Sequence, residues 1–74
     1  MKIKDLSIFR DEIEEILGEI YDLKIEKRMS FNAVVIYKEY GVRLDALEEL
    51  KEYFGLDVKM AIYYFSKGVK IVLQ

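Results

Sequence analysis

The chain has 74 residues, a formal net charge of −2 and a hydrophobic content of 53%, with six Tyr and four Phe. This length predicts one domain, residues 1–74, with a small core. A sequence without Cys excludes a disulfide and a thiolate metal site, and the nearly balanced charge argues neither for nor against a nucleic-acid partner. So much apolar surface for one small core favours a homodimer or a covered partner face.

The composition also bears on source and location. Lys, Glu and Ile are frequent and side-chain amides are scarce, a balance typical of thermophiles that a biased small genome also produces. No apolar run approaches the roughly 20 residues of a membrane span, and the N-terminus leads into an acidic segment instead of a signal-peptide core. We therefore expect a cytoplasmic protein with no membrane partner.

A helix is predicted from Ser7, a suitable N-cap, to about Ile20 or Tyr21. Its apolar residues recur with helical period and form one stripe: Phe9, Ile13, Ile16, Leu17 and Ile20. Gly18 interrupts the pattern, which predicts a close approach by a neighbouring element such as a second copy of this helix. The predicted dimer interface consists of four residues of this segment: Phe9, Ile13, Leu17 and Gly18.

Two strands are expected next. Apolar and polar residues alternate from Asp22 to Met29, which predicts a half-buried strand. After a turn at residues 29–32, residues 33–40 are β-branched and aromatic and predict a second strand paired with the first. The competing interpretation of this run is a helix capped by Ser30 and stopped by Gly41.

The second half of the chain predicts another helix and a hairpin. Asp45 and Glu48 have the spacing of an acidic capping box at the start of a helix that runs to Phe54, and Gly55 supplies the stop. Residues 57–74 form two apolar, β-rich runs around a short turn, which predicts a β-hairpin. Gly68 is expected to take a positive φ in that turn.

The order helix–strand–strand therefore occurs twice, and strand side chains alternate between two faces. One set is assigned to the side covered by the helices: Val34, Ile36, Val58, Met60, Ile62, Val69, Ile71 and Leu73. The other set faces the open side: Lys24, Glu26, Arg28, Lys59, Ala61, Tyr63, Phe65, Lys70 and Val72. The predicted fold is an α+β two-layer sandwich of αββαββ order, with a four-stranded antiparallel sheet and both helices on one face. This order resembles a circularly permuted ferredoxin-like fold, which many functions use.

The sequence holds no catalytic or cofactor motif. It contains no His and no Cys, and its Ser residues and four glycines form neither a nucleophile turn nor a phosphate-binding loop. The acids of the first helix, Asp11, Glu14 and Glu15, are expected to be solvated and not to bind metal. We expect a non-enzymatic protein without a cofactor, a metal or a small-molecule substrate.

The candidate site is the open sheet face, which combines rings and cations. Phosphates attract Lys and Arg, while unpaired bases stack on aromatic rings. The predicted nucleic-acid-binding residues are Lys24, Arg28, Lys59, Tyr63, Phe65 and Lys70. The alternative is that Tyr63, Phe65, Ala61 and Val72 form a dimer interface and that the lysines protect the sheet edges from aggregation.

Residues Ile16-Leu17-Gly18-Glu19-Ile20-Tyr21-Asp22-Leu23 resemble the motif of the LAGLIDADG homing endonucleases. The likeness extends more loosely to Leu47–Gly55 and to the order of elements. It implies dimerisation through the first helix and DNA contact by the sheet. The metal-binding acid of that family falls on Leu23 here, with Asp22 one place off, so the resemblance implies no cleavage.

A second resemblance, to winged helix-turn-helix domains, depends on residues 30–40 being helical. Gly41-Val42 would then be the turn and the last hairpin the wing, with apolar positions at Ile36, Tyr40, Val42, Leu47 and Leu50. Two features argue against it. Tyr37 stands where that family has a small residue, and the second helix carries acids that phosphates repel.

The sequence thus predicts a small nucleic-acid-binding module, DNA-binding or regulatory, that uses the open sheet face. The alternative is a protein-interaction module, for example a viral or mobile-element accessory protein, that dimerises through the sheet or the first helix. Both depend on residues 31–40 being extended.

Overall fold

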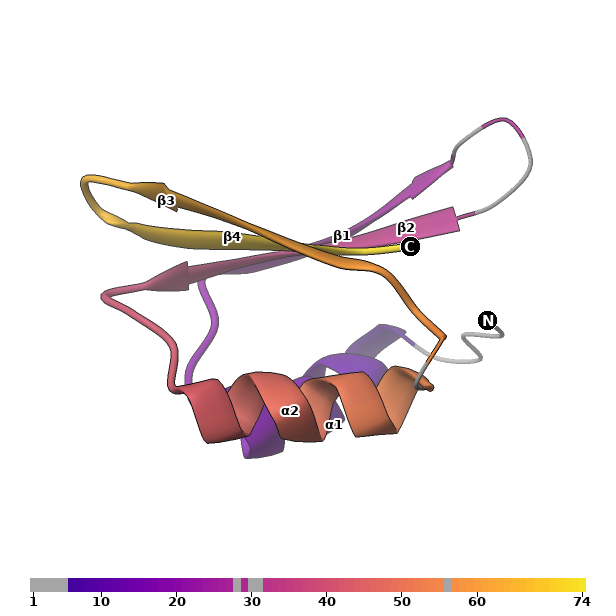
Figure 1. The fold of residues 1–74 in the computed structure, drawn as a ribbon, viewed down its shortest axis with the longest axis horizontal. Helices are drawn as coiled ribbons and strands as arrows, with labels where there is room; N and C mark the ends of the chain where they lie inside the picture. Colours follow the sequence, from indigo (N-terminus) through magenta and orange to yellow (C-terminus); the bar gives the residue numbers. More distant parts are fainter. Residues whose placement is uncertain (1–5, 28, 30–31, 56) are drawn as a thin grey trace.

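The computed structural model describes residues 6–27, 29, 32–55 and 57–74. Two helices lie on one side of a four-stranded antiparallel sheet (Figure 1), which confirms the predicted αββαββ fold. The elements in chain order are α1 (Leu6–Leu17), β1 (Asp22–Lys27), β2 (Asn32–Glu39), α2 (Leu44–Phe54), β3 (Met60–Phe65) and β4 (Gly68–Leu73). The strand order is β1-β2-β4-β3, so β2 and β4 are central and β1 and β3 are the edges.

The strand β2 rules out the helix-turn-helix interpretation of this segment. Residues 32–39 are extended and pair with both β1 and β4. The reason lies in the run Val34, Val35 and Ile36, whose three side chains are all 0% exposed. β-Branched side chains pack well on both faces of a central strand, whereas in a helix they lose rotamer freedom.

The main core lies between the helices and the lower face of the sheet. Ile13 of α1 and Leu50 of α2 are fully buried. Five strand residues that were assigned to this face are all buried in the same cluster: Val34, Ile36, Val69, Ile71 and Leu73. Val58, Met60 and Ile62 are partly buried against it, so the assignment of faces from strand alternation is confirmed.

Gly18 ends α1, and no other element of the described chain makes the close approach predicted at this residue. Its φ is +86°, its N–H donates to the Glu14 carbonyl at 2.8 Å, and a Cβ built on it would meet no atom within 4 Å. The helix therefore ends at Leu17, before the predicted Ile20 or Tyr21, because glycine adopts a left-handed conformation at little cost. Ile20 remains 3% exposed in the loop that follows.

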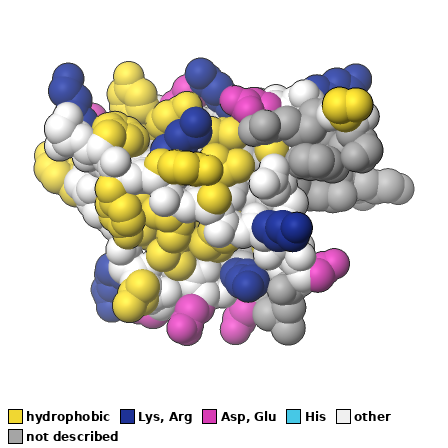
Figure 2. All heavy atoms as spheres, turned by 45° about the horizontal axis from the view of Figure 1, so that its top comes forward, with side chains coloured by type: hydrophobic (Ala, Val, Ile, Leu, Met, Phe, Trp, Pro, Cys, Tyr) yellow, Lys and Arg dark blue, Asp and Glu magenta, His cyan; other side chains and the backbone are white. Residues whose placement is uncertain are grey.

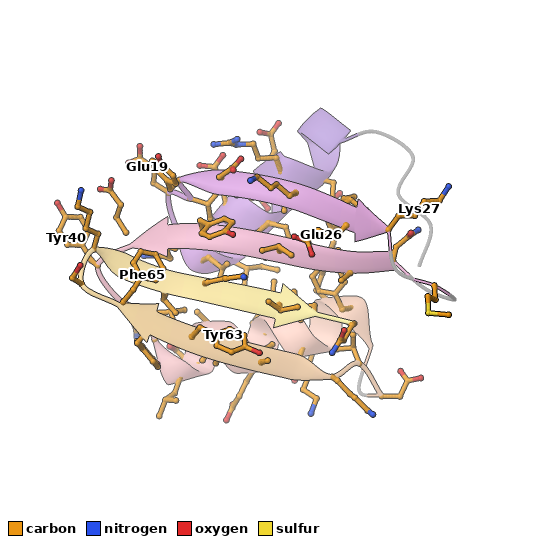
Figure 3. All side chains as sticks on the ribbon, turned by 90° about the horizontal axis from the view of Figure 1, so that it is seen from above. Glu19, Glu26, Lys27, Tyr40, Tyr63 and Phe65 are labelled. Carbon is orange, nitrogen blue, oxygen red and sulfur yellow. The ribbon has the colours of Figure 1, made fainter. Side chains whose placement is uncertain are left out.

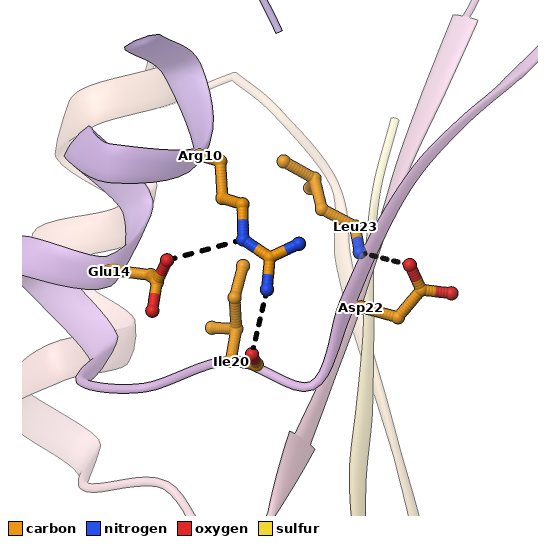
Figure 4. Close-up of polar contacts among 5 residues, drawn as sticks. All are labelled: Arg10, Glu14, Ile20, Asp22 and Leu23. Carbon is orange, nitrogen blue, oxygen red and sulfur yellow. Dashed lines mark hydrogen bonds and ion pairs between the residues drawn. The ribbon is translucent and has the colours of Figure 1, made fainter. Parts of the chain in front are cut away.

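The loop between α1 and β1 is held by Arg10, as Figure 4 shows. The guanidinium donates from Nε to Glu14 Oε1 at 3.2 Å and from Nη2 to the Ile20 carbonyl at 3.2 Å. At the start of β1 the Leu23 N–H donates to Asp22 Oδ1 at 2.9 Å. These bonds fix the direction in which the chain enters the sheet.

Helix α2 begins differently from the prediction and ends as predicted. Its N-cap is Arg43, which makes no side-chain cap bond, so the capping box of Asp45 and Glu48 is wrong. Asp45 lies in the first turn instead, where its two carboxylate oxygens accept from Arg43 Nε and Nη2 at 3.1 Å each. Gly55 follows the last turn with a φ of +116° and donates its N–H to the Lys51 carbonyl.

Gly68 begins β4, and its predicted positive φ is wrong. Among the glycines, the structure gives a positive φ only to Gly18 and Gly55. A Cβ on Gly68 would lie 2.2 Å from the Lys38 carbonyl oxygen and 2.9 Å from the Glu39 Cα. Glycine is needed here because β4 approaches the backbone of β2 too closely for any side chain.

Candidate nucleic-acid interface on the open sheet face

In the described part of the chain both helices lie on the lower side of the sheet (Figure 1), yet part of the upper face is buried as well. Ala33 and Val35 of β2 are 0% exposed and Val72 of β4 is 6% exposed, although both helices lie on the opposite side. Tyr37 and Ala61 pack against this cluster. The open face thus has a small core of its own, which supports the rings and cations beside it.

Four side chains cross this face, one from each strand, and alternate between cation and ring. Lys24 Nζ of β1 lies 5.7 Å from the centre of the Tyr37 ring of β2, and Lys70 Nζ of β4 lies 5.9 Å from the same ring. Lys70 Nζ also lies 5.7 Å from the Tyr63 ring of β3. We call Lys24, Tyr37, Lys70 and Tyr63 the cation–ring ladder.

The strand register produces this ladder. Tyr37 is paired with Lys70, and Lys70 is paired with Tyr63, so the three side chains stand in one row across β2, β4 and β3. Directly opposed residues are the closest neighbours on a sheet surface. Each contact has cation–π geometry, which is worth about 0.5–1 kcal/mol at exposed sites and favours the observed ring directions.

The ladder remains accessible to a ligand. Tyr63 is 56% exposed and the neighbouring Phe65 is 49% exposed. Figure 2 shows basic side chains set among hydrophobic ones on this face. In Figure 3, Tyr63 and Phe65 lie along β3, and Phe65 is at the same end of the sheet as Tyr40. Rings and cations are therefore presented together to solvent.

The sequence-predicted residues fall on this face with two qualifications. Lys24, Tyr63, Phe65 and Lys70 lie there by strand alternation, as predicted. Lys59 precedes β3, is exposed, and exchanges two backbone hydrogen bonds with Gln74 at 2.8 and 2.9 Å. Arg28 and part of the predicted turn at 29–32 lie outside the described residues.

Tyr37, the centre of the ladder, is the residue that the sequence prediction missed. The signal was present, because assigning Val34 and Ile36 to the helix-covered face places Val35 and Tyr37 on the other one. The ladder contacts themselves could not be predicted, since they depend on the long-range pairing of β2 with β4.

Acidic side chains moderate the charge of this face. Asp22 Oδ2 lies 3.8 Å from Lys24 Nζ, with both groups well exposed, so this ion pair is weak. Glu26 shares the open side of β1 with Lys24. The positive potential of the face is therefore modest.

An aromatic pocket of about 330 Å³ continues the surface at one end of the sheet. It is lined by Tyr21, Tyr37, Lys38, Glu39, Phe65 and Lys67. The Tyr21 N–H donates to the Tyr37 carbonyl at 2.7 Å, which holds the α1–β1 loop against β2. The next residue after β2, Tyr40, is 88% exposed and has a φ of 68°.

Three of the four residues predicted to form a dimer interface on the first helix are buried in the core of the single chain. Phe9 is 7% exposed, Ile13 0% and Leu17 7%, all in the main core. Gly18 is exposed. A dimer through these side chains would require them to leave the core. Leu23, the position that matches the metal-binding acid of LAGLIDADG proteins, is also buried there.

Comparison with known proteins found no match: no family model, no curated protein and no solved structure matches the chain. Within the described residues, neither helix is long and apolar enough to cross a membrane. The assignment of a function therefore depends on the geometry of the open face.

Proposed function

We propose that the protein binds single-stranded nucleic acid on its open sheet face, with the cation–ring ladder as the contact surface. The observation that carries this proposal is the alternation of two rings and two ammonium groups across all four strands. Exposed aromatic side chains on a four-stranded sheet stack two or three unpaired bases in other RNA-binding domains. The lysines between the rings are suitably placed for phosphates.

The pre-set direction of the rings favours stacking. Tyr37 is held between Lys24 and Lys70, and Tyr63 shares Lys70 with it. Adjacent strands are about 4.8 Å apart, so the rings of β2 and β3 are about 10 Å apart with β4 between them. Two splayed bases of one strand can occupy two such rings, and binding then costs little side-chain ordering.

Burial on the open face argues against an apolar protein interface at the same place. Ala33, Val35 and Val72 are already 0–6% exposed in the single chain. A partner would gain little from covering them, because hydrophobic stabilisation follows the apolar area newly removed from water. What remains exposed is the ring and ammonium surface, whose chemistry suits bases and phosphates.

Charge distribution predicts a weak, oriented and salt-dependent complex. Residues 5–21 hold six acids and one Arg, whereas residues 57–74 hold three Lys and one acid. The helical layer therefore repels phosphates and the sheet attracts them. With a net charge of −2 on the chain, non-specific attraction is small, so stacking must supply much of the affinity.

Fluorescence anisotropy with labelled single-stranded oligonucleotides tests the stacking part. Tyr63→Leu is expected to weaken binding by about 5- to 150-fold, because stacking on one ring is worth about 1–3 kcal/mol. Tyr64→Leu is the matched control: Tyr64 is the next residue of β3, is 71% exposed and lies on the other face. Equal loss in both variants, or none in Tyr63→Leu, would contradict the proposal.

A salt titration tests the phosphate part. Lys70→Gln is expected to weaken binding and to reduce the dependence of log Kd on log salt concentration by about 1. Lys51→Gln, on the exposed surface of α2, is expected to change neither quantity. Absence of binding to single-stranded DNA and RNA at low salt would sink the proposal and leave the protein-interaction alternative.

A further inference from the structure

The two edges of the sheet differ in how well they are protected. The edge strand β1, Asp22–Lys27, carries two acids and two lysines among its six residues. The edge strand β3 is Met-Ala-Ile-Tyr-Tyr-Phe, without a charge or a proline. An uncharged, apolar edge of this length is a template for pairing with another strand, and proteins normally block such edges unless they use them.

Backbone hydrogen bonding shows which groups of β3 are available. Lys59 and Gln74 exchange both of their backbone bonds, and pairs of this kind alternate along an antiparallel ladder. Ala61, Tyr63 and Phe65 therefore also bond to β4. The N–H and C=O groups of Met60, Ile62 and Tyr64 point away from the sheet, and in the described part of the chain they have no partner.

We propose that β3 pairs antiparallel with β3 of a second copy, about a two-fold axis at Ile62, to form an eight-stranded sheet in a homodimer. In this register Ile62 faces Ile62, and Met60 faces Tyr64 on both sides of the axis. All three outward-pointing residues then exchange hydrogen bonds in both copies. No other register pairs all three with one another.

Charge selects the same register. Centring the pair on Ile62 brings the turn before β3, which carries Asp57, towards the β3–β4 turn of the other copy, which carries Lys67, at both ends of the junction. Shifting the axis to Tyr63 would bring Lys59 towards Lys67 of that turn, and like charges brought together across strands destabilise pairing. Asp57 and Lys67 are both exposed in the single chain, so they are free to meet a partner.

The proposed junction keeps the two layers of the fold intact. Because opposed residues in this register have the same parity, both helical layers lie on one side and both open faces on the other. Ala61 then faces Tyr63 of the second copy, which places two cation–ring ladders on one continuous surface. The dimer follows from the strand edge alone and does not depend on the proposed function.

Molar mass by light scattering or sedimentation, across a concentration series, tests the dimer. The chain has a mass of 8.8 kDa, and the wild type is expected to reach twice that value. Tyr64→Pro removes an N–H that points outward and leaves the bonds to β4 in place, so a folded monomer is expected. Tyr64→Thr, which keeps the N–H, is the control and is expected to remain a dimer.

Charge reversal tests the register with substitutions at exposed positions that leave the core unchanged. Asp57→Lys and Lys67→Asp are each expected to shift the equilibrium towards monomer, and the double variant is expected to restore the dimer. A wild type that stays monomeric at all concentrations, or a Tyr64→Pro variant that dimerises as the wild type does, would overturn the proposal. Tighter dimerisation of Lys67→Asp alone would overturn the register, because it would indicate Lys59 opposite Lys67.

Discussion

At the scale of single residues, Gly68 shows how a close backbone contact can dictate a residue type. The space for a side chain is occupied by the Lys38 carbonyl oxygen, 2.2 Å from where a Cβ would stand. Gly68 begins β4 and Lys38 belongs to β2, and these two central strands are neighbours in the sheet although they are far apart in the sequence. The sequence therefore indicated that a glycine is needed at position 68, but the close contact between β4 and β2 that requires it could not be predicted from the local pattern.

Gly68→Ala is expected to destabilise the fold by about 1–3 kcal/mol, because the two central strands must move apart to admit the methyl group. Gly41→Ala is the control, since a Cβ at Gly41 meets no atom within 4 Å. Urea unfolding followed by circular dichroism measures both variants. Equal midpoints for the two would contradict the close contact.

Among the described residues other than glycine, Tyr40 has a positive φ, of 68°. A left-handed conformation costs an L-residue about 1–2 kcal/mol. Because the Tyr40 side chain is 88% exposed, packing contributes little stabilisation to offset this cost. Tyr40→Gly is therefore expected to stabilise the chain by up to about 1 kcal/mol, after the greater unfolded-state entropy of glycine is subtracted. A loss of stability in urea would show instead that the ring makes a contact that matters.

At the scale of elements, the two helices are joined by an aromatic cluster and by a hydrogen bond between Tyr53 and Glu12. The Phe9 ring of α1 lies 5.5 Å from the Phe54 ring and 6.2 Å from the Tyr53 ring of α2, between ring centres. The Tyr53 hydroxyl donates to Glu12 Oε2. Partial burial, the hydrogen bond to the Glu12 carboxylate and the charge of that carboxylate together raise the pKa of Tyr53 to about 12, with burial the largest cause.

This pKa predicts a specific alkaline effect. A pKa raised above the unfolded value of about 10 stabilises the fold below pH 10, and this stabilisation is lost as pH rises towards 12. Tyr53→Phe is expected to lose stability less steeply between pH 10 and 12 than the wild type. Thermal unfolding over that range measures the slope, and Glu12→Gln should reduce it in the same direction. Identical slopes in wild type and Tyr53→Phe would contradict the contact.

The strands and helices were predictable because local patterns fix them, whereas their ends and contacts depend on distant parts of the chain. The β-branched run of β2 predicted a strand, with a helix as the competing interpretation, and the alternation of faces predicted which strand side chains face the helices. The end of α1 was missed because Ile20 continues the apolar stripe from a loop, where it is buried just as a helical residue would be. Tyr37 was predictable from alternation, but its two lysine neighbours required the register.

At the scale of the whole molecule, the fold has two layers that differ in charge. An acidic helical layer covers one face of the sheet, and a mildly basic face with exposed rings remains open (Figures 1 and 2). On that face the aliphatic cluster of Ala33, Val35 and Val72 is already buried, while the rings of Tyr63 and Phe65 remain exposed. The same face would be doubled by pairing at the β3 edge.

The most direct test of the proposed interface is a nitrogen-15 NMR titration of the full chain with a short single-stranded oligonucleotide. Amide shifts of Lys24, Tyr37, Tyr63 and Lys70 are expected to change progressively, while those of α2 stay constant, and added salt should reverse the changes. Shifts confined to the helices, or a spectrum that does not change at low salt, would contradict the account.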